Sequence, residues 1–204
     1  MLGMAYAPVD PGTSQASYPA QTFDELSDLY AEKIFDHTGP VRPVILGHSL
    51  GGTLSREVIM RLNRRGHQIK DVVMLDTWKV AKRALKTSDV TDFIQETFKG
   101  VPNIDAVVQR AQRLSDLIRE HDYTKNGLRI HLFKAQILGM SALKNSVRSD
   151  LSEEMVRAMR SNGLQQLSSH KVQVHIVPGN HETMMAEENL LTVRDAILRI
   201  AKST

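Results

Sequence analysis

The chain has 204 residues, of which 41% are hydrophobic and 24% are charged. These are the proportions of a globular protein, so they exclude an intrinsically disordered chain and a fibrous repeat. Its 26 basic and 23 acidic residues give a net charge of +3, and no long basic run accompanies it, which argues against a nucleic-acid-binding protein. The chain has no cysteine, which excludes disulfides, thiolate metal sites and cysteine nucleophiles. No stretch is apolar enough to span a membrane and the first residues do not resemble a signal peptide, so we expect a soluble, cytoplasmic domain.

The first third of the chain predicts alternating strands and helices. Met1–Pro8 is a short apolar run typical of a buried strand, and the Pro-, Gly- and Ser-rich stretch 9–21 predicts a loop. Thr22–His37 begins with the capping-box sequence Thr-Phe-Asp-Glu and carries apolar residues at helical spacing, so we expect an amphipathic helix. Pro43–Leu46 predicts a short central strand, and the helix that follows ends near Gly66.

The rest of the chain continues this alternation. Strands are predicted at Asp71–Asp76, Leu128–Gln136 and Lys171–Val177, and helices around Ser152–Arg160 and Asn189–Ala201. Nearly continuous apolar strands that alternate with helices indicate βαβ units and a mostly parallel sheet. The whole chain, 1–204, is therefore predicted to be a single α/β domain.

One segment interrupts the alternation. Lys79–Asn126 contains no convincing strand but has two groups of apolar residues at helical spacing. A structureless loop of this length would be unusual in a compact domain. We therefore predict that residues 79–126 form a helical lid inserted above the sheet.

The candidate nucleophile lies between a predicted strand and a predicted helix. Residues 47–51, Gly-His-Ser-Leu-Gly, match the pattern G-x-S-x-G. A serine on so sharp a turn needs neighbours without a bulky Cβ, which explains the glycines at Gly47 and Gly51. The helix that follows would point its N-terminal N–H groups at a developing oxyanion. This context makes Ser49 the candidate nucleophile.

A serine nucleophile needs a base, and we assign this role to His181. It follows the last predicted strand in a Pro-Gly-Asn turn, at the carboxyl edge of the sheet where catalytic groups gather. A zinc site at His181-Glu182 is rejected because the second histidine of H-E-x-x-H is missing.

The other seven histidines have simpler interpretations. His131 and His175 alternate with apolar residues inside predicted strands and are expected to be structural. The side chain of His48 is expected to point away from the face that Ser49 presents. The remaining four are expected near element ends on the surface: His37, His67, His121 and His170.

The acid that orients the base has two candidate positions. Many α/β-hydrolases carry it after the strand that here is Leu128–Gln136, but no carboxylate follows until Asp150. The strand just after the nucleophile helix ends in Asp76. An aspartate there is also common as a helix cap or turn residue. Because the first position is empty and the second is occupied, we favour Asp76.

Together these segments resemble the thioesterase domains of non-ribosomal peptide synthetases and polyketide synthases. The resemblance rests on GPVRPVILGHSLGG, DVVMLDTW, IHLFKAQ and VHIVPGNHETMM, which span most of the chain. It implies an α/β-hydrolase fold with helices on both faces of the sheet and a helical lid. It also implies that the family's first strand and its glycine-rich loop are missing here, so that Leu50 N–H is one oxyanion donor and the second is unassigned.

The resemblance further implies a reaction. Ser49 would take an acyl or peptidyl chain from the phosphopantetheine of a carrier protein, with His181 as base and Asp76 holding its tautomer, and without another cofactor. Water, or a hydroxyl or amine of the chain, would release the product by hydrolysis or macrocyclisation. Editing of stalled carriers, a stand-alone esterase or lipase, and a docking module without activity are the alternatives.

A carrier protein is also suggested by a group of cations after Asp76. Four basic residues recur at helical spacing, and a solvated helix face is the simpler explanation. If they instead contact an acidic carrier helix, reversing two of these charges would weaken carrier binding in a salt-dependent way. The four are Lys79, Lys82, Arg83 and Lys86.

Overall fold

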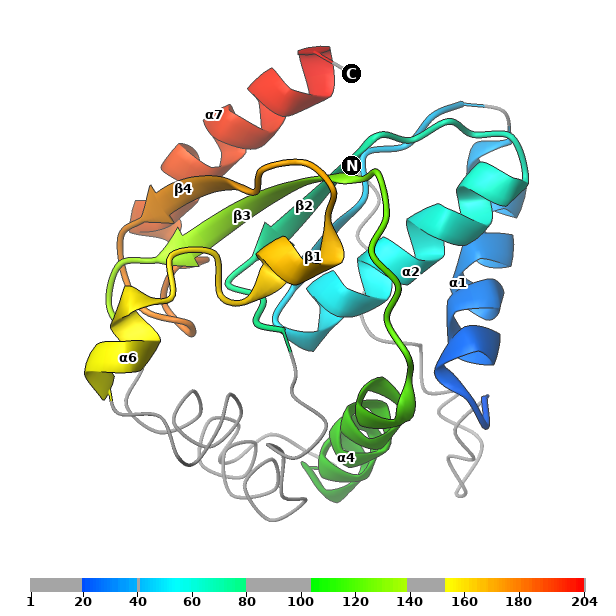
Figure 1. The fold of residues 1–204 in the computed structure, drawn as a ribbon, viewed down its shortest axis with the longest axis horizontal. Coiled ribbons are helices and arrows are strands. Elements are labelled where there is room, and N and C mark those ends of the chain that lie inside the picture. Colours follow the sequence, from blue (N-terminus) through cyan, green and yellow to red (C-terminus); the bar gives the residue numbers. More distant parts are fainter. Residues whose placement is uncertain (1–19, 40, 80–103, 139–152, 204) are drawn as a thin grey trace.

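The computed structural model describes residues 20–39, 41–79, 104–138 and 153–203 (Figure 1). The predicted first strand, Met1–Pro8, lies outside these ranges. In chain order the elements are α1 (Phe23–Thr38), β1 (Leu46–His48), α2 (Leu50–Arg64), β2 (Asp71–Leu75), α4 (Ile104–Glu120), β3 (Arg129–Ala135), α6 (Glu153–Ala158), the short 3₁₀ helix η1 (Leu164–Leu167), β4 (Gln173–Val177) and α7 (Glu187–Ser203). Within the described ranges, no helix is long and apolar enough to cross a membrane.

The four strands form one parallel sheet in the order β1-β2-β3-β4. Residues Gly47 and Met74 are partners in the first pair, Leu75 and Phe133 in the second. All the carboxyl ends therefore lie at one edge, which is where the predicted site residues follow β1, β2 and β4. The α/β class and the parallel sheet are confirmed.

Strand β1 differs from its prediction in position. It begins at Leu46 instead of Pro43, because proline has no N–H to donate to a ladder. Within the described ranges β1 stands at one end of the strand order and pairs with β2 alone, although it was predicted to be central.

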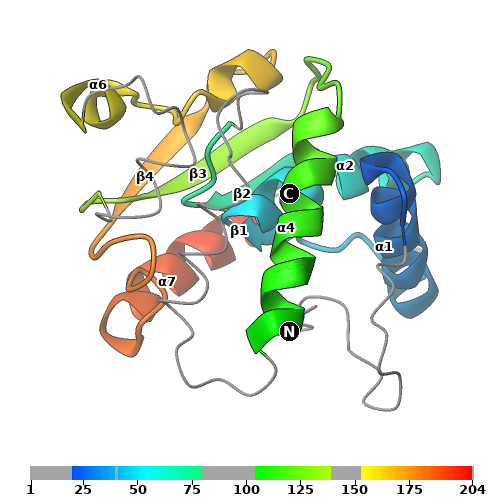
Figure 2. The same cartoon turned by 90° about the horizontal axis from the view of Figure 1, so that it is seen from below.

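Helices cover both faces of the sheet (Figures 1 and 2). Alternate residues of β2 point to opposite sides because side chains alternate along a strand. Val72 and Met74 belong to the core cluster that α2 completes, with Ile59 fully buried there. Val73 and Leu75 belong to the cluster that α7 completes on the other face. This arrangement fixes the sheet between two layers of helices.

Helix α1 begins with the predicted capping box. The Thr22 hydroxyl accepts the N–H of Glu25 at 3.1 Å, and the Glu25 carboxylate accepts the N–H of Thr22 in return at 3.4 Å. These bonds satisfy two of the N–H groups that a helix start leaves without partners.

Helix α4 lies within the segment predicted as a lid. Its residues Leu114, Leu117 and Ile118 are buried against Phe23 and Leu26 of α1, so the expected helical spacing here is confirmed. This part of the insertion is packed into a core cluster. Residues 80–103 lie outside the described ranges, and the lid function stays a prediction.

Candidate active site

The turn that carries Ser49 is strained in the way a nucleophile turn requires. Strand β1 ends at His48 and α2 begins at Leu50, so Ser49 alone makes the connection. Its φ of +56° lies in a region that non-glycine residues rarely adopt. Two backbone bonds hold it there: its N–H donates to Leu75 O at 2.9 Å, and its carbonyl accepts the Gly52 N–H at 3.1 Å.

The glycines around Ser49 allow α2 to pass close to the strand. A Cβ on Gly47 would lie less than 3.0 Å from the Gly51 backbone, and one on Gly52 equally close to the Thr77 side chain. Around Gly51 nothing lies within 4 Å of such a Cβ. The prediction that Gly51 must lack a side chain is therefore wrong. The crowded positions are Gly47, which faces the backbone of α2 at Gly51, and Gly52, which faces the Thr77 side chain after β2.

His181 and Asp76 form a buried hydrogen-bonded pair. His181 Nδ1 lies 2.8 Å from Asp76 Oδ2, although the two residues are 105 positions apart. Only 7% of His181 and 2% of Asp76 is exposed. The second carboxylate oxygen, Asp76 Oδ1, accepts the Ala135 N–H at 3.2 Å. Both oxygens thus accept N–H groups, so neither is buried without a hydrogen-bond partner.

Two neighbours connect Ser49 with this pair. Thr77, the residue after Asp76, donates its hydroxyl to the Ser49 carbonyl at 3.0 Å. His48 Nε2 lies 3.0 Å from the backbone carbonyl of His181. The bonds described for Ser49 are made by its backbone, and none of them joins its hydroxyl to the His181 ring. The structure therefore brings the three candidate residues to one edge and bonds two of them directly.

The expectation that the His48 side chain points away from the site is wrong. Its ring centroid lies 4.6 Å from that of His181, with 30° between the ring planes. Since a carbonyl can only accept, Nε2 of His48 must carry the proton in its bond to His181 O. Burial first, and then the neighbouring His181 imidazole, lower the pKa of His48. His48 is thus a neutral donor that holds the backbone of the candidate base.

Replacement of His48 by Phe should lower kcat by about tenfold while the fold is kept, because the ring remains but the N–H to His181 O is lost. The measurement is steady-state hydrolysis of an acyl-pantetheine thioester, with the melting temperature recorded in parallel. His48→Gln is the matched control, since its amide N–H can reach the same carbonyl and should retain most of the rate. Equal rates for wild type and His48→Phe would contradict this positioning role.

The histidines inside strands have structural contacts, as expected. His131 Nε2 lies 2.9 Å from Asp71 Oδ1, and the ring of His175 stacks on Phe133 at 4.7 Å. Of the four expected on the surface, His37 and His170 are exposed. His67 is only 7% exposed, and the ring of His121 packs edge-on against the rings of Phe23 and Tyr123. The prediction that these two histidines lie on the surface is therefore wrong.

The His175 ring predicts a stability that depends on pH. Burial, and then the nearby His131 and Arg199, lower its pKa in the folded chain. The unfolded chain therefore binds the proton first, and the free energy of unfolding should fall as the pH drops below about 6.5, the ordinary histidine value. His175→Phe keeps the stacked ring without the charge and should lose less stability between pH 7 and pH 5. Urea unfolding at both pH values measures this, and an unchanged loss would contradict it.

Other predicted groups lie partly within the described ranges. Leu50 is the first residue of α2, so its N–H stands at a helix N-terminus, and its oxyanion role stays a prediction. Lys79 donates to the side-chain oxygen of Gln166. The three other cations of the expected carrier surface, at positions 82, 83 and 86, lie outside the described ranges. Among the described residues no three His, Asp or Glu side chains are grouped so that they could hold a metal ion.

The chain is similar in sequence and in fold to known thioesterase domains and synthase subunits. The chain is 26% identical over 179 residues to one of the subunits of mycosubtilin synthase from Bacillus subtilis, a match that covers 82% of this chain and 6% of that much longer protein. The solved NocB thioesterase domain, in covalent complex with a fluorophosphonate nocardicin G analog, has a TM-score of 0.65 at 24% identity and covers 93% of this chain and 79% of that one.

Two further structures have the same fold. ClbQ, from the colibactin non-ribosomal peptide and polyketide pathway, gives a TM-score of 0.61 at 15% identity over 90% of this chain and 78% of that one. The four-domain non-ribosomal peptide synthetase AB3403 gives 0.66 at 16% identity, over 91% of this chain and 16% of that one. The family model described as the thioesterase domain matches residues 4–202. With a parallel α/β sheet, a serine at a strained strand-to-helix turn and a histidine–aspartate pair beside it, the chain belongs to the thioesterase domain family.

Proposed function

We propose that this chain is a serine thioesterase that releases an acyl or peptidyl chain from the phosphopantetheine of a carrier protein. The observation that carries the proposal is the buried bond from His181 to Asp76 at the sheet edge that also holds the strained Ser49 turn. A histidine whose Nδ1–H is donated to a carboxylate presents the lone pair of Nε2, which is the atom that can take a proton from a serine. Membership of the thioesterase domain family supports the same reaction class.

The first half of the reaction would load the chain onto Ser49. His181 Nε2 takes the Ser49 hydroxyl proton while Oγ attacks the thioester carbon. The oxyanion that forms lies near the N-terminus of α2, where Leu50 N–H is a donor. The oxyanion then re-forms the carbonyl as the C–S bond breaks, His181 gives its proton to the leaving phosphopantetheine thiolate, and the acyl chain is held as an ester on Ser49.

The second half would release the product. Water, or a hydroxyl or amine of the chain itself, gives its proton to His181 Nε2 and attacks the ester carbon. The bond to Oγ breaks, and His181 returns the proton to Ser49. Throughout, the Asp76 carboxylate accepts the Nδ1–H of His181 and compensates the positive charge on the imidazolium. Hydrolysis and macrocyclisation differ only in the attacking group.

The partner in this proposal is an acyl or peptidyl carrier. Of the proteins that this chain resembles, one is named as a subunit of mycosubtilin synthase, and AB3403 is named as a four-domain non-ribosomal peptide synthetase. We propose that the carrier presents the chain to Ser49 as a thioester and that no further cofactor takes part.

Intact-protein mass spectrometry tests the proposal. Acyl-pantetheine thioesters mixed with the protein should give a mass increase of one acyl group or steady release of free thiol. Both should disappear in Ser49→Ala, because no oxygen is left to form the ester. An adduct or thiol release that persists in Ser49→Ala, or the absence of both in a well-folded wild type, would contradict the proposal. Faster turnover of matched oxoesters than thioesters would instead indicate a stand-alone esterase.

A further inference from the structure

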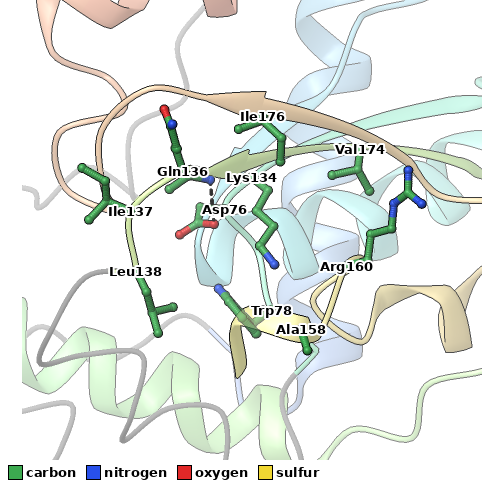
Figure 3. A pocket seen from close by; sticks show the side chains of 11 residues that line it. Asp76, Trp78, Lys134, Gln136, Ile137, Leu138, Ala158, Arg160, Val174 and Ile176 are labelled. Atoms are coloured by element: carbon green, nitrogen blue, oxygen red, sulfur yellow. Dashed lines mark hydrogen bonds between the residues drawn. The ribbon is translucent and has the colours of Figure 1, made fainter. Parts of the chain in front are cut away.

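A cavity of about 370 Å³ lies beside Asp76, between β3, β4 and α6 (Figure 3). This volume is in the range of small-molecule binding sites. Asp76 is among its lining residues, whereas Ser49 and His181 are not. The Asp76 carboxylate thus faces the candidate base with one oxygen and borders the cavity from the end of β2. The cavity adjoins the candidate site without containing the reacting atoms.

The walls of the cavity are largely apolar. Val174 and Ile176 are alternate residues of β4, so both point to the same face of the sheet. Ile137 follows β3 at the carboxyl edge of the sheet. Both isoleucines are largely exposed: 56% of the surface of Ile137 and 59% of that of Ile176 is accessible. Large apolar side chains that line a cavity and stay exposed are covered when an apolar ligand binds.

Two donors interrupt these apolar walls. Only 8% of Trp78 is exposed, and its indole N–H has no hydrogen-bond partner among the described residues. The Lys134 ammonium lies 5.4 Å from the centre of the Trp78 ring and donates to Met159 O at 2.8 Å, which uses one of its three N–H groups. In Figure 3 the indole nitrogen and the ammonium both point into the space below Asp76. A buried N–H without a partner is costly, so a ligand oxygen that accepts it would bind there.

Near the two donors, the Asp76 carboxylate favours a neutral acceptor over an anionic one. Burial lowers the pKa of Lys134, and Asp76 opposes this effect. The Asp76 carboxylate would repel a ligand carboxylate much more strongly than the oxygen of a neutral carbonyl group. Arg160 also lines the cavity, but its guanidinium points away from Trp78 in Figure 3.

We propose that this cavity binds the acyl chain of the substrate and recognises a neutral carbonyl oxygen within it, through the Trp78 indole N–H and the Lys134 ammonium. The substrate class is therefore a chain with an internal amide or ketone, as in a peptidyl or keto-acyl chain, in preference to a plain alkyl chain. This inference rests on the proposed function, because it assigns the chain that Ser49 would carry.

Trp78 is the one tryptophan of the chain, so its fluorescence reports directly on the cavity. The Ser49→Ala protein is titrated with two N-acetylcysteamine thioesters of equal chain length, octanoyl and propanoylaminobutanoyl, which differ by an internal amide. We expect both to change the Trp78 emission and the amide chain to bind about tenfold more tightly, as one added hydrogen bond provides. Equal affinities for the two chains would overturn the inference.

Two substitutions assign the preference to the two donors. Lys134→Met, in the same fluorescence titration, should reduce the ratio of affinities toward one. Trp78→Phe keeps an aromatic ring but removes the N–H, and should reduce the ratio of kcat/KM for the two chains in the protein with Ser49 intact. Arg160→Met is the matched control, because it removes a cation from the same wall and should leave both ratios unchanged. A ratio that survives both Lys134→Met and Trp78→Phe would overturn the inference.

The two proposals fail in different ways. If the thioesters are bound with the expected preference but never hydrolysed, the proposed function is wrong and the cavity assignment stands. If both are hydrolysed at equal rates and bound equally, the function stands and the cavity assignment is wrong.

Discussion

Asp76→Asn should lower kcat/KM for an acyl-pantetheine thioester on the order of 10⁴-fold, while the protein remains folded. The size of the effect follows from the two bonds of the Asp76 carboxylate: one oxygen accepts from His181 Nδ1 and the other from Ala135 N–H. An asparagine has one accepting oxygen and one NH₂ group. Its NH₂ group must therefore face one of the two N–H donors, with which it cannot form a hydrogen bond.

Either orientation of the asparagine amide harms the site. With NH₂ toward His181, the ring must accept at Nδ1 and carry its proton on Nε2, where it can no longer take the proton of Ser49. With NH₂ toward Ala135, two N–H groups meet in a buried place, and the positive charge that His181 acquires in the reaction has no carboxylate beside it. The activity falls in both cases.

The matched control is the aspartate at the other end of β2. Asp71 accepts from His131 Nε2 at 2.9 Å and forms an ion pair with Arg129, and both Arg129 and this histidine hold the pKa of Asp71 below its ordinary value despite burial. Asp71→Asn should lower the free energy of unfolding and leave kcat/KM nearly unchanged. Comparable losses of kcat/KM in both variants would show that Asp76 acts on stability alone.

Gly47→Ala should destabilise the fold by about 3 kcal/mol or more, which lowers the melting temperature by about 10 °C. The added Cβ would lie less than 3.0 Å from Gly51 O and from the Ser55 hydroxyl. The Ser55 side chain can rotate away, but Gly51 O belongs to the backbone of α2. Relief of the clash must therefore move the helix away from β1, and with it the turn that holds Ser49. Thermal unfolding and thioesterase rate should both report the change.

Gly51→Ala is the control for that prediction. A Cβ at Gly51 meets nothing within 4 Å, and alanine is the better helix former by about 1 kcal/mol. We therefore expect equal or greater stability in this variant. An unchanged melting temperature in Gly47→Ala, together with a lowered one in Gly51→Ala, would contradict this prediction. It would mean that the crowded position is Gly51 and not Gly47.

Local sequence patterns predicted what depends on neighbours along the chain. The capping box at Thr22, the strand at Asp71–Leu75 and the strained turn at Ser49 each follow from a few adjacent residues, and each is present in the structure. The choice of Asp76 over the empty position after β3 used only chain order, and the structure joins its carboxylate to His181. The catalytic roles of these residues stay predictions.

Features that depend on residues far apart in sequence were missed. Helical spacing on α2 gave no sign that Arg56 is fully buried. It is bonded to the adjacent Glu57 and to Thr124 O, which lies 68 positions away, and no periodicity encodes that partner. The role of His48 was missed for the same reason, since the carbonyl it binds lies 133 positions later. In both cases tertiary contacts offset the cost of placing a polar group in an apolar environment.

The parallel sheet also sets the order in which the candidate site can form during biosynthesis. Ser49 and Asp76 follow the first two described strands, whereas His181 follows the last, and each strand waits for a crossover connection before it can pair. Contacts between residues this distant in the chain form slowly, because the entropy of closing the loop is lost before the contact stabilises it. A nascent chain that has completed β1 and β2 therefore carries Ser49 without its candidate base. If His181 is that base, we expect activity in a refolding experiment to appear only after the last strand has paired.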